Sequence, residues 1–200
     1  MILSNDAQKS LTAVVAAGVA RCAQKLGDAT HDPWRVAEVT LSLEQAGPFA
    51  AVFDGVVNDH YGSFLTFPGG SLVVLFAGKS GYLVTNAFTR DIQDRVEGLN
   101  QREASTLGEI ANIVLNPLVG HLAKAWGISL VVSAPSTRIA SRRDHLTKAL
   151  EPYGVGGRDG DRLAATFFVR LACDELFSEG QILLFLDQDL VAKIAGSAAA

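Results

Sequence analysis

The sequence predicts an α+β fold of two pseudo-symmetric halves, in which long helices pack on a mostly antiparallel sheet of about six strands. Two amphipathic helical patterns begin about 100 residues apart, and the apolar runs that follow Gly70 and Gly180 match each other. The turns between consecutive strand patterns are short, which favours antiparallel pairing. We therefore expect one domain over residues 1–200, with approximate halves 1–100 and 101–200.

The first half begins with a helical pattern over residues 6–26, which we expect Gly27 to end. The residues that recur at helical spacing, and should face the core, are Leu11, Val14, Val15, Gly18, Cys22 and Leu26. A strand is expected over residues 37–43, where Val39 and Leu41 alternate with polar residues.

The rest of the first half contains further strand patterns and one helix. Residues 49–57 and 63–67 are weaker strand candidates, and the cluster at residues 68–70, Pro-Gly-Gly, is a strong turn signal. The run "SLVVLFAG" after this turn has the continuous apolar character of a buried strand. A helix is expected over residues 80–99.

The second half repeats this order. A helix over residues 100–126 is followed by the strand-like "SLVVSAP" and by a helical pattern over residues 137–150. The segments "LAATFFVRLACDEL" and "QILLFLDQ" are expected to form two long strands before a short terminal helix.

Composition and charge exclude several classes of protein. A hydrophobic content of 48% in 200 residues suits a compact domain, and a net charge of −4 argues against nonspecific nucleic-acid binding. No apolar run reaches the roughly 18 residues that span a bilayer, and the N-terminus has no signal-peptide pattern. We expect a cytoplasmic protein without a membrane span, in which Cys22 and Cys173 are buried thiols.

The sequence has no recognisable cofactor, metal or hydrolytic motif. The glycine-rich "YGVGGRDGDR" lacks the Lys-Ser/Thr of a P-loop, and the paired aspartates do not continue into a calcium-binding pattern. The histidines are scattered, and no serine or cysteine lies in a nucleophile-elbow context. We therefore expect no cofactor and no metal of the protein's own.

The helix over residues 105–127 carries three polar residues on one side. Glu109, Asn112 and Asn116 lie diametrically opposite the apolar stripe, at roughly 140° to 200° from Leu107. Glu109 could instead form a capping box with Thr106, or the three side chains could simply belong to a solvated face. A helix start at Asn100 would place Glu109 beyond the first turn.

The segment "LGEIANIVLNPLVGHLAKAWG" resembles the Glu-x-x-Asn helix of the CheC/CheX/FliY family of bacterial chemotaxis phosphatases. Leu107, Glu109, Asn112 and Ile113 match that pattern. The order of elements, including the apolar strand after "ELFSEGQ", is similar to the family along nearly the whole chain. The resemblance implies a phosphatase that acts on a phosphorylated CheY-like response regulator.

Two departures from the family pattern stand out. Asn116 occupies a position where the family often has glycine, and Pro117, which follows it, is expected to kink the helix. The corresponding positions of the first helix are Ser10 and Ala13, so the motif is not repeated in that helix and a single site is expected. A single motif resembles the CheX arrangement more closely than that of CheC.

The resemblance also implies roles for the residues on this face. Asn112 would hold the attacking water and Glu109 would pair with a lysine of the response regulator, while Asn116 would contact the same partner. The phosphoaspartate and its Mg²⁺ would come from the partner's receiver domain. The alternative is a non-catalytic adaptor of the chemosensory or flagellar apparatus. A homodimer is also expected, because the first helix should expose the small residues Ala13, Ala16, Ala17 and Ala20.

Overall fold

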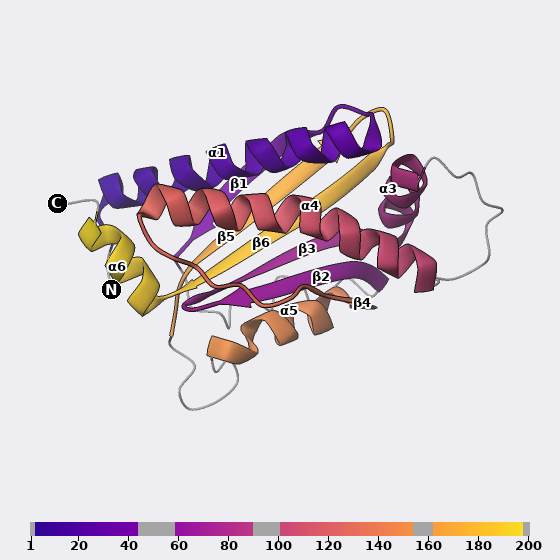
Figure 1. Ribbon diagram of the computed structural model, residues 1–200. Helices are drawn as coiled ribbons and strands as arrows, with labels where there is room; N and C mark the ends of the chain where they lie inside the picture. The colour runs from indigo at the N-terminus through magenta and orange to yellow at the C-terminus, as the bar shows by residue number, and fades with distance from the viewer. Residues whose placement is uncertain (1–2, 44–58, 90–100, 154–161, 198–200) are drawn as a thin grey trace.

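The computed structural model describes residues 3–43, 59–89, 101–153 and 162–197. In these ranges the chain forms a single six-stranded sheet with helices packed on it (Figure 1). The helices are α1 (Asn5–Thr30), α3 (Gly78–Thr89), α4 (Gln101–Trp126), α5 (Arg142–Leu150), the 3₁₀ turn η1 (Glu151–Tyr153) and α6 (Gln188–Ser197). The strands are β1 (Arg35–Ser42), β2 (Asp59–Phe67), β3 (Gly70–Ala77), β4 (Ser136–Ser141), β5 (Leu163–Cys173) and β6 (Ser178–Asp187).

The sheet is antiparallel throughout and its strand order is symmetric. The order is β1-β5-β6-β3-β2-β4. Exchanging β1 with β4, β2 with β5 and β3 with β6 gives the same order read backwards. The register agrees, because Gly70 pairs with Leu186 while Gly180 pairs with Phe76, 110 positions apart in each case. The predicted fold class, with two pseudo-symmetric halves, is confirmed. The boundary expected near residue 100 lies outside the described residues.

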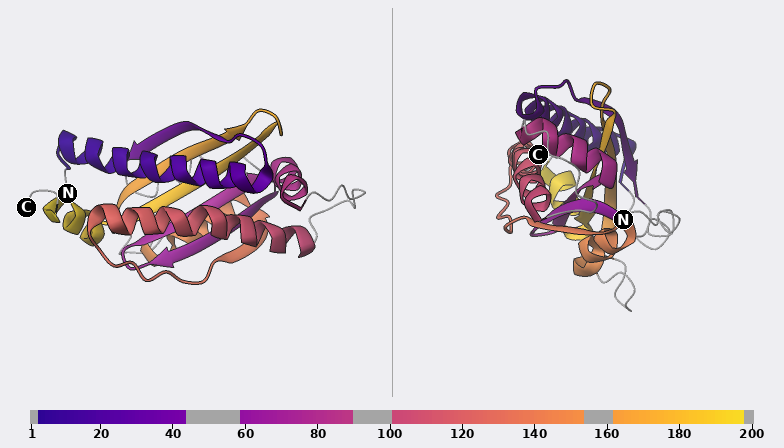
Figure 2. Two further views of the ribbon diagram at one scale, coloured as in Figure 1. Left: turned by 45° about the horizontal axis from the view of Figure 1, so that its top comes forward. Right: turned by 90° about the vertical axis from the view of Figure 1, so that its right-hand side faces the viewer.

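The two faces of the sheet are covered differently. Helices α1 and α4 lie side by side over one face, and α5 lies against the other (Figures 1 and 2). Strand β3 is buried on both sides: Leu72 and Val74 belong to the core under α1 and α4, whereas Val73 and Leu75 pack in the core under α5. This double burial explains why β3 has a continuous apolar run instead of an alternating one.

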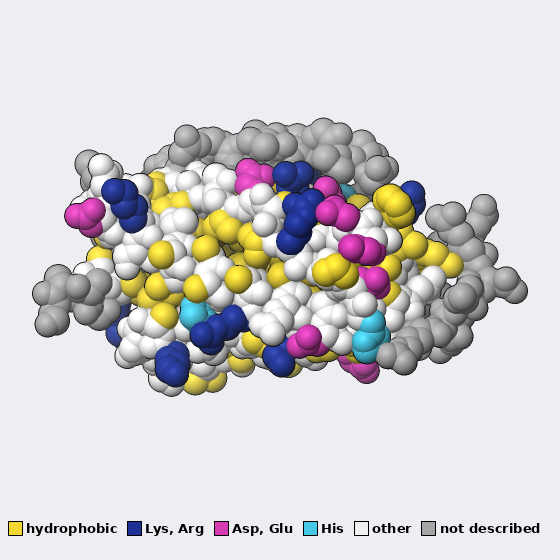
Figure 3. Space-filling model, turned by 90° about the horizontal axis from the view of Figure 1, so that it is seen from above, with side chains coloured by type: hydrophobic (Ala, Val, Ile, Leu, Met, Phe, Trp, Pro, Cys, Tyr) yellow, Lys and Arg dark blue, Asp and Glu magenta, His cyan; other side chains and the backbone are white. Residues whose placement is uncertain are grey.

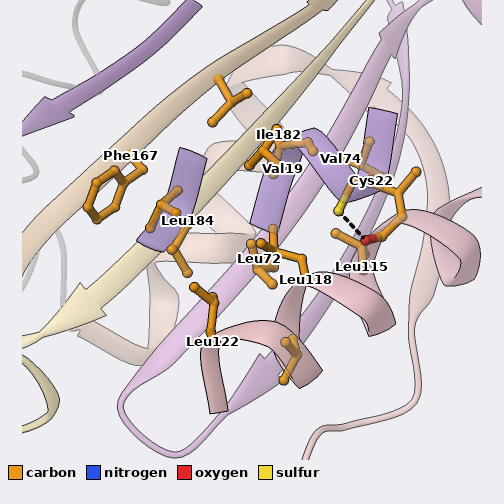
Figure 4. Close-up of a cluster of buried hydrophobic side chains, with 14 of the residues drawn as sticks. Val19, Cys22, Leu72, Val74, Leu115, Leu118, Leu122, Phe167, Ile182 and Leu184 are labelled. Carbon is orange, nitrogen blue, oxygen red and sulfur yellow. Dashed lines mark hydrogen bonds between the residues drawn. The ribbon is translucent and has the colours of Figure 1, made fainter. Parts of the chain in front are cut away.

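Helices α1 and α4 approach each other closely at Gly18. A Cβ atom at Gly18 would lie 2.7 Å from Leu118 Cδ1 and 2.9 Å from His121 Cδ2. One helical turn further along α1, the Cys22 thiol donates a hydrogen bond to the carbonyl oxygen of Val114 at 3.1 Å (Figure 4). Burial raises the pKa of Cys22 to about 12, so this thiol stays protonated and serves packing.

Helix α1 ends one turn later than predicted. Gly27 was expected to stop it, but the helix continues to Thr30 and is capped by His31, which has φ 63° and donates its N–H to the Gly27 carbonyl. The last turn is stabilised by a buried pair of hydrogen bonds: Thr30 Oγ1 donates to the Leu26 carbonyl and accepts from Trp34 Nε1. These contacts, made by residues beyond Gly27, extend the helix.

The predictions for residues 129–150 are partly wrong. "SLVVSAP" is not a strand, and the segment predicted as a helix from residue 137 begins with β4. Val131 is 76% exposed, and within this run Leu130 packs against the core. Strand β4 pairs along β2, and Ser141 then caps α5 by accepting a hydrogen bond from the Asp144 N–H. Edge pairing by polar residues therefore overrides the local apolar signal.

The remaining predicted elements are confirmed where they are described. The turn at residues 68–69 joins β2 to β3, with Gly69 at φ 81°. This value is accessible to glycine and fits a turn with proline before it. The strand candidate at residues 49–57 and the end of the helix predicted over residues 80–99 lie outside the described residues. Within the described ranges, no helix combines the length and the apolar character needed to cross a bilayer.

Candidate functional site: an exposed ridge on α4

Three polar side chains form a ridge along α4. Glu109, Asn112 and Asn116 are all exposed, spaced by three and four residues, which is the spacing of neighbours on one helix face. The opposite side of the same helix consists of buried apolar side chains, which include Ile110, Leu115, Leu118 and Leu122. The predicted separation of a core stripe from a polar face is therefore confirmed, and we refer to Glu109, Asn112 and Asn116 as the α4 ridge.

The capping interpretation of Glu109 is not supported. Helix α4 begins at Gln101, so Thr106 lies in its second turn and cannot be the N-cap residue. The predicted cap at Asn100 lies outside the described residues. Glu109 is thus in the interior of the helix, where its exposed carboxylate has no capping role.

The α4 helix is continuous through Pro117. Proline removes one backbone donor, so the helix lacks the hydrogen bond that residue 117 would give to the Ile113 carbonyl. The helix nevertheless continues to Trp126, and its core residues on both sides of the proline, Leu115 and Leu118, are fully buried. Asn116 remains on the exposed face beside the proline. Packing against the sheet and α1 holds the two parts of α4 together.

The ridge is supported from behind by the sheet. A Cβ atom at Gly108 would lie 3.2 Å from Thr137 Oγ1 of β4, so this glycine allows a close approach of helix and strand. The Thr137 hydroxyl lies 2.7 Å from the Ser63 hydroxyl of β2. Sequence reasoning missed this support, although a glycine inside a predicted helix is a signal of close packing.

The ridge side chains are available to a partner. In the part of the chain that the structure describes, no hydrogen bond or ion pair engages the side chains of Glu109, Asn112 or Asn116. A carboxylate and two amides are thus presented to solvent on a helix whose other side is fixed in the core. An amide can both donate and accept hydrogen bonds, and it does so without titrating.

Helix α1, the first-half counterpart of α4, does not repeat this arrangement. The sequence comparison placed Ser10 and Ala13 of α1 at the positions of Glu109 and Asn112. Both residues are exposed on α1. Helix α1 contains no glutamate, so it carries no Glu-x-x-Asn pair.

Solved structures of chemotaxis and flagellar proteins share this fold. FliY of Thermotoga maritima matches with a TM-score of 0.73 at 14% identity, over 100% of this chain and 98% of that chain. FliM of H. pylori, in a complex with SpeE, matches with a TM-score of 0.66 at 11% identity, over 98% of both chains. The chemotaxis protein CheX of Desulfovibrio desulfuricans matches with a TM-score of 0.57 at 13% identity, over 88% of this chain and 99% of that chain.

The chain therefore has the fold of the CheC, CheX, FliY and FliM proteins along nearly its whole length, as the resemblance implied. No family model matches the sequence, and no curated protein sequence matches it. At these identities the likeness is one of fold, and the chemistry must be argued from the residues of this chain.

Proposed function

We propose that this chain is a cytoplasmic phosphatase that dephosphorylates the phosphoaspartate of a CheY-like response regulator. The observation that carries the proposal is the placement of Glu109 and Asn112, exposed and three residues apart on a helix whose other side is buried. A helix fixed in this way can present both side chains to a partner with little loss of conformational freedom.

The two ridge residues would have different roles in the reaction. Hydrolysis of an acyl phosphate needs a water molecule in line with the leaving oxygen, and catalysis consists mainly of positioning and charge stabilisation. The Asn112 carboxamide would accept a hydrogen bond from that water and hold it next to the phosphorus atom, opposite the leaving oxygen. Glu109 would pair with a lysine beside the receiver's phosphorylation site, and Asn116 would hydrogen bond to the receiver surface.

No cofactor of this chain is needed in the proposed reaction. The receiver would bring the phosphoaspartate and the Mg²⁺ that neutralises its charge. The water oxygen would bond to phosphorus as the bond from phosphorus to the aspartate oxygen breaks; the aspartate would leave as a carboxylate, and the protons of the water would end on the released inorganic phosphate. The ridge therefore has to position the water and the receiver, and Asn112 does not have to change its protonation state.

The proposal is tested with Asn112→Ala and Asn112→Asp. Phosphate release from a phosphorylated CheY-like receiver should fall by about a hundredfold or more in Asn112→Ala, because the water is no longer positioned. Asn112→Asp should also be strongly impaired, because it removes the amide donor and brings a negative charge toward the phosphoryl group. Lys124→Ala, an exposed change further along α4, should leave the rate unchanged.

Glu109→Ala separates binding from chemistry. It should weaken binding to the phosphorylated receiver while the melting temperature stays close to that of the unmodified protein, since exposed substitutions usually change stability by less than about 0.5 kcal/mol. An Asn112→Ala variant that hydrolyses the phosphorylated receiver as fast as the unmodified protein would show that the catalytic assignment is wrong.

A non-catalytic adaptor is the second candidate function. Two observations favour it: the first helix, α1, carries no Glu-x-x-Asn pair, and FliM of the same fold has been captured in complexes with SpeE and with FliG. An adaptor would bind a flagellar or chemosensory partner without accelerating phosphate release. Receiver binding without any rate enhancement by the unmodified protein would favour this candidate over the phosphatase.

A further inference from the structure

The turn between β5 and β6 exposes a phenylalanine side chain to solvent. Phe177 is 85% exposed, and it has φ 47°, a conformation that aromatic L-residues rarely adopt. Its N–H donates to the Asp174 carbonyl at 3.1 Å, which closes the turn between the paired residues Cys173 and Ser178. Glycine would suit this backbone position better. The turn therefore carries a large apolar side chain that its own conformation does not require.

An open, mostly apolar hollow lies at the base of this turn. It has a volume of about 480 Å³ and is formed by the end of α1, by α3 and by the turn. Its apolar lining comes from Leu83 and Ala87 of α3 and from Leu176, the residue before Phe177. None of its lining residues belongs to α4, so this surface is made by elements other than the ridge.

Two carboxylates, those of Asp32 and Glu175, lie at or beside the hollow. Asp32 lines it, and Glu175 precedes Leu176 in the turn. Burial raises the pKa of Cys173, and the carboxylates of Asp32 and Glu175 raise it further, so both groups lie near this thiol. Figure 3 shows acidic and hydrophobic side chains near the end of α1, with Lys and Arg side chains beside some of them.

The end of α1 adds to this negative field. The last turn of α1 contains no basic residue, and the carbonyl groups at a helix C-terminus carry partial negative charge. Arg35 is the cation that pairs with Asp174 in the turn, at 3.0 Å. A partner that brings positive charge would complement both the carboxylates and the helix end.

We propose that this surface, composed of Phe177, Leu176, Leu83 and Ala87 with Asp32 and Glu175 beside them, binds a short basic and apolar segment of another protein. An apolar side chain of that segment occupies the hollow and contacts the Phe177 ring, and flanking lysine or arginine residues meet the carboxylates. A second copy of this chain is a poorer occupant, because its net charge is −4.

Two synthetic amphipathic peptides test this proposal. One has leucines on one helical face and lysines elsewhere, and the other has glutamates in place of the lysines. In fluorescence anisotropy the lysine peptide should bind the full-length protein, and the glutamate peptide should bind at least about tenfold more weakly. Amide shifts of the isotope-labelled protein should change at Leu83, Ala87 and Leu176.

Phe177→Gly is the decisive variant. Because glycine accepts the backbone conformation of the turn, the variant should melt no lower than the unmodified protein, yet its affinity for the lysine peptide should fall at least about tenfold. Every charge is retained, so binding by charge alone would be unaffected. Val131→Ser, which removes another exposed apolar side chain, is the matched control and should bind the lysine peptide normally.

Several results would overturn the proposal. These are equal binding of both peptides, no binding of the lysine peptide, unchanged binding by Phe177→Gly, or amide shifts confined to other surfaces. A concentration-dependent dimer that Phe177→Gly abolishes, with no peptide binding, would identify a second copy as the occupant instead.

Discussion

His145 is a buried histidine that fills space beside a glycine. It is 2% exposed, and a Cβ atom at Gly62 would lie 2.2 Å from His145 Cε1. Its Nε2 lies 3.0 Å from the His60 carbonyl oxygen, to which a protonated Nε2 donates. Burial lowers the pKa of His145, and the charges of Arg138 and His60 lower it further, against the opposing effects of the hydrogen bond to the His60 carbonyl and of Asp144.

This lowered pKa predicts a loss of stability in mild acid. Below about pH 6.5, the unfolded chain binds a proton at His145 that the native state does not accept. The free energy of unfolding should therefore fall as the pH drops from 7 toward 5, with a slope of at most about 1.4 kcal/mol per pH unit for this one group. Urea denaturation at a series of pH values measures it.

The control for this prediction is His145→Gln. The variant should be less stable at neutral pH, because it disturbs a packed site, but its stability should depend less on pH in that interval. If the variant and the unmodified protein lose stability in parallel between pH 7 and 5, His145 is not the responsible group.

At the scale of elements, replacing two helical glycines by alanine should change the stability of the protein in opposite directions. At Gly18 an added Cβ would lie 2.7 Å from Leu118 Cδ1, whereas at Gly120, on the exposed face of α4, it would meet nothing within 4 Å. Gly18→Ala should lower the free energy of unfolding by about 1–3 kcal/mol through overpacking. Gly120→Ala should raise it by about 0.5–1 kcal/mol, because alanine is the better helix former.

Chemical denaturation of the two variants side by side tests both values. A stabilised Gly18→Ala would mean that α1 and α4 can move apart at no cost. A destabilised Gly120→Ala would mean that the exposed face of α4 is covered in the free protein.

Sequence patterns correctly predicted those helices and strands whose own apolar residues identify the face that is buried. The core stripe of α4 and the apolar run of β3 are examples, because helical spacing and a continuous apolar run each identify the surface that must be buried. The side of α4 on which Glu109 and Asn112 lie followed from the same counting. Their roles depended on a resemblance, because exposure alone does not distinguish a site from a solvated face.

The failures came from contacts between distant segments. β4 has few apolar residues, and it forms because β2 presents an unpaired edge. The hollow below Phe177 combines residues of α1, α3 and the β5–β6 turn. No local pattern contains this information, since these segments are joined only in the folded chain.

At the scale of the whole molecule, the surface of α1 predicts self-association. Ala13, Ala17 and Ala20 are exposed on α1, while Ala16 is half-buried. Small side chains let a second helix approach closely, so we still expect a homodimer through this face. Light scattering should give twice the 21.1 kDa mass of one chain at micromolar concentration, and Ala17→Glu should reduce it to that of one chain.

The control is Lys124→Ala, which should leave the mass of the dimer unchanged. A mass of one chain for the unmodified protein, constant as the concentration is raised, would contradict the prediction. A dimer that persists in Ala17→Glu would place the interface on another surface.

The symmetric strand order carries a historical implication. β1 is hydrogen bonded to β5 of the other half, and β4 to β2 of the other half, so each half lends its outer strand to its counterpart. If the two halves descend from one duplicated gene, the ancestral product was half as long and could complete its sheet only by exchanging strands with a twin. Fusion of the two copies would then have allowed each half to change its sequence independently. Ser10 and Ala13 could in that case have replaced a Glu and an Asn on α1 while the helix kept its packing position.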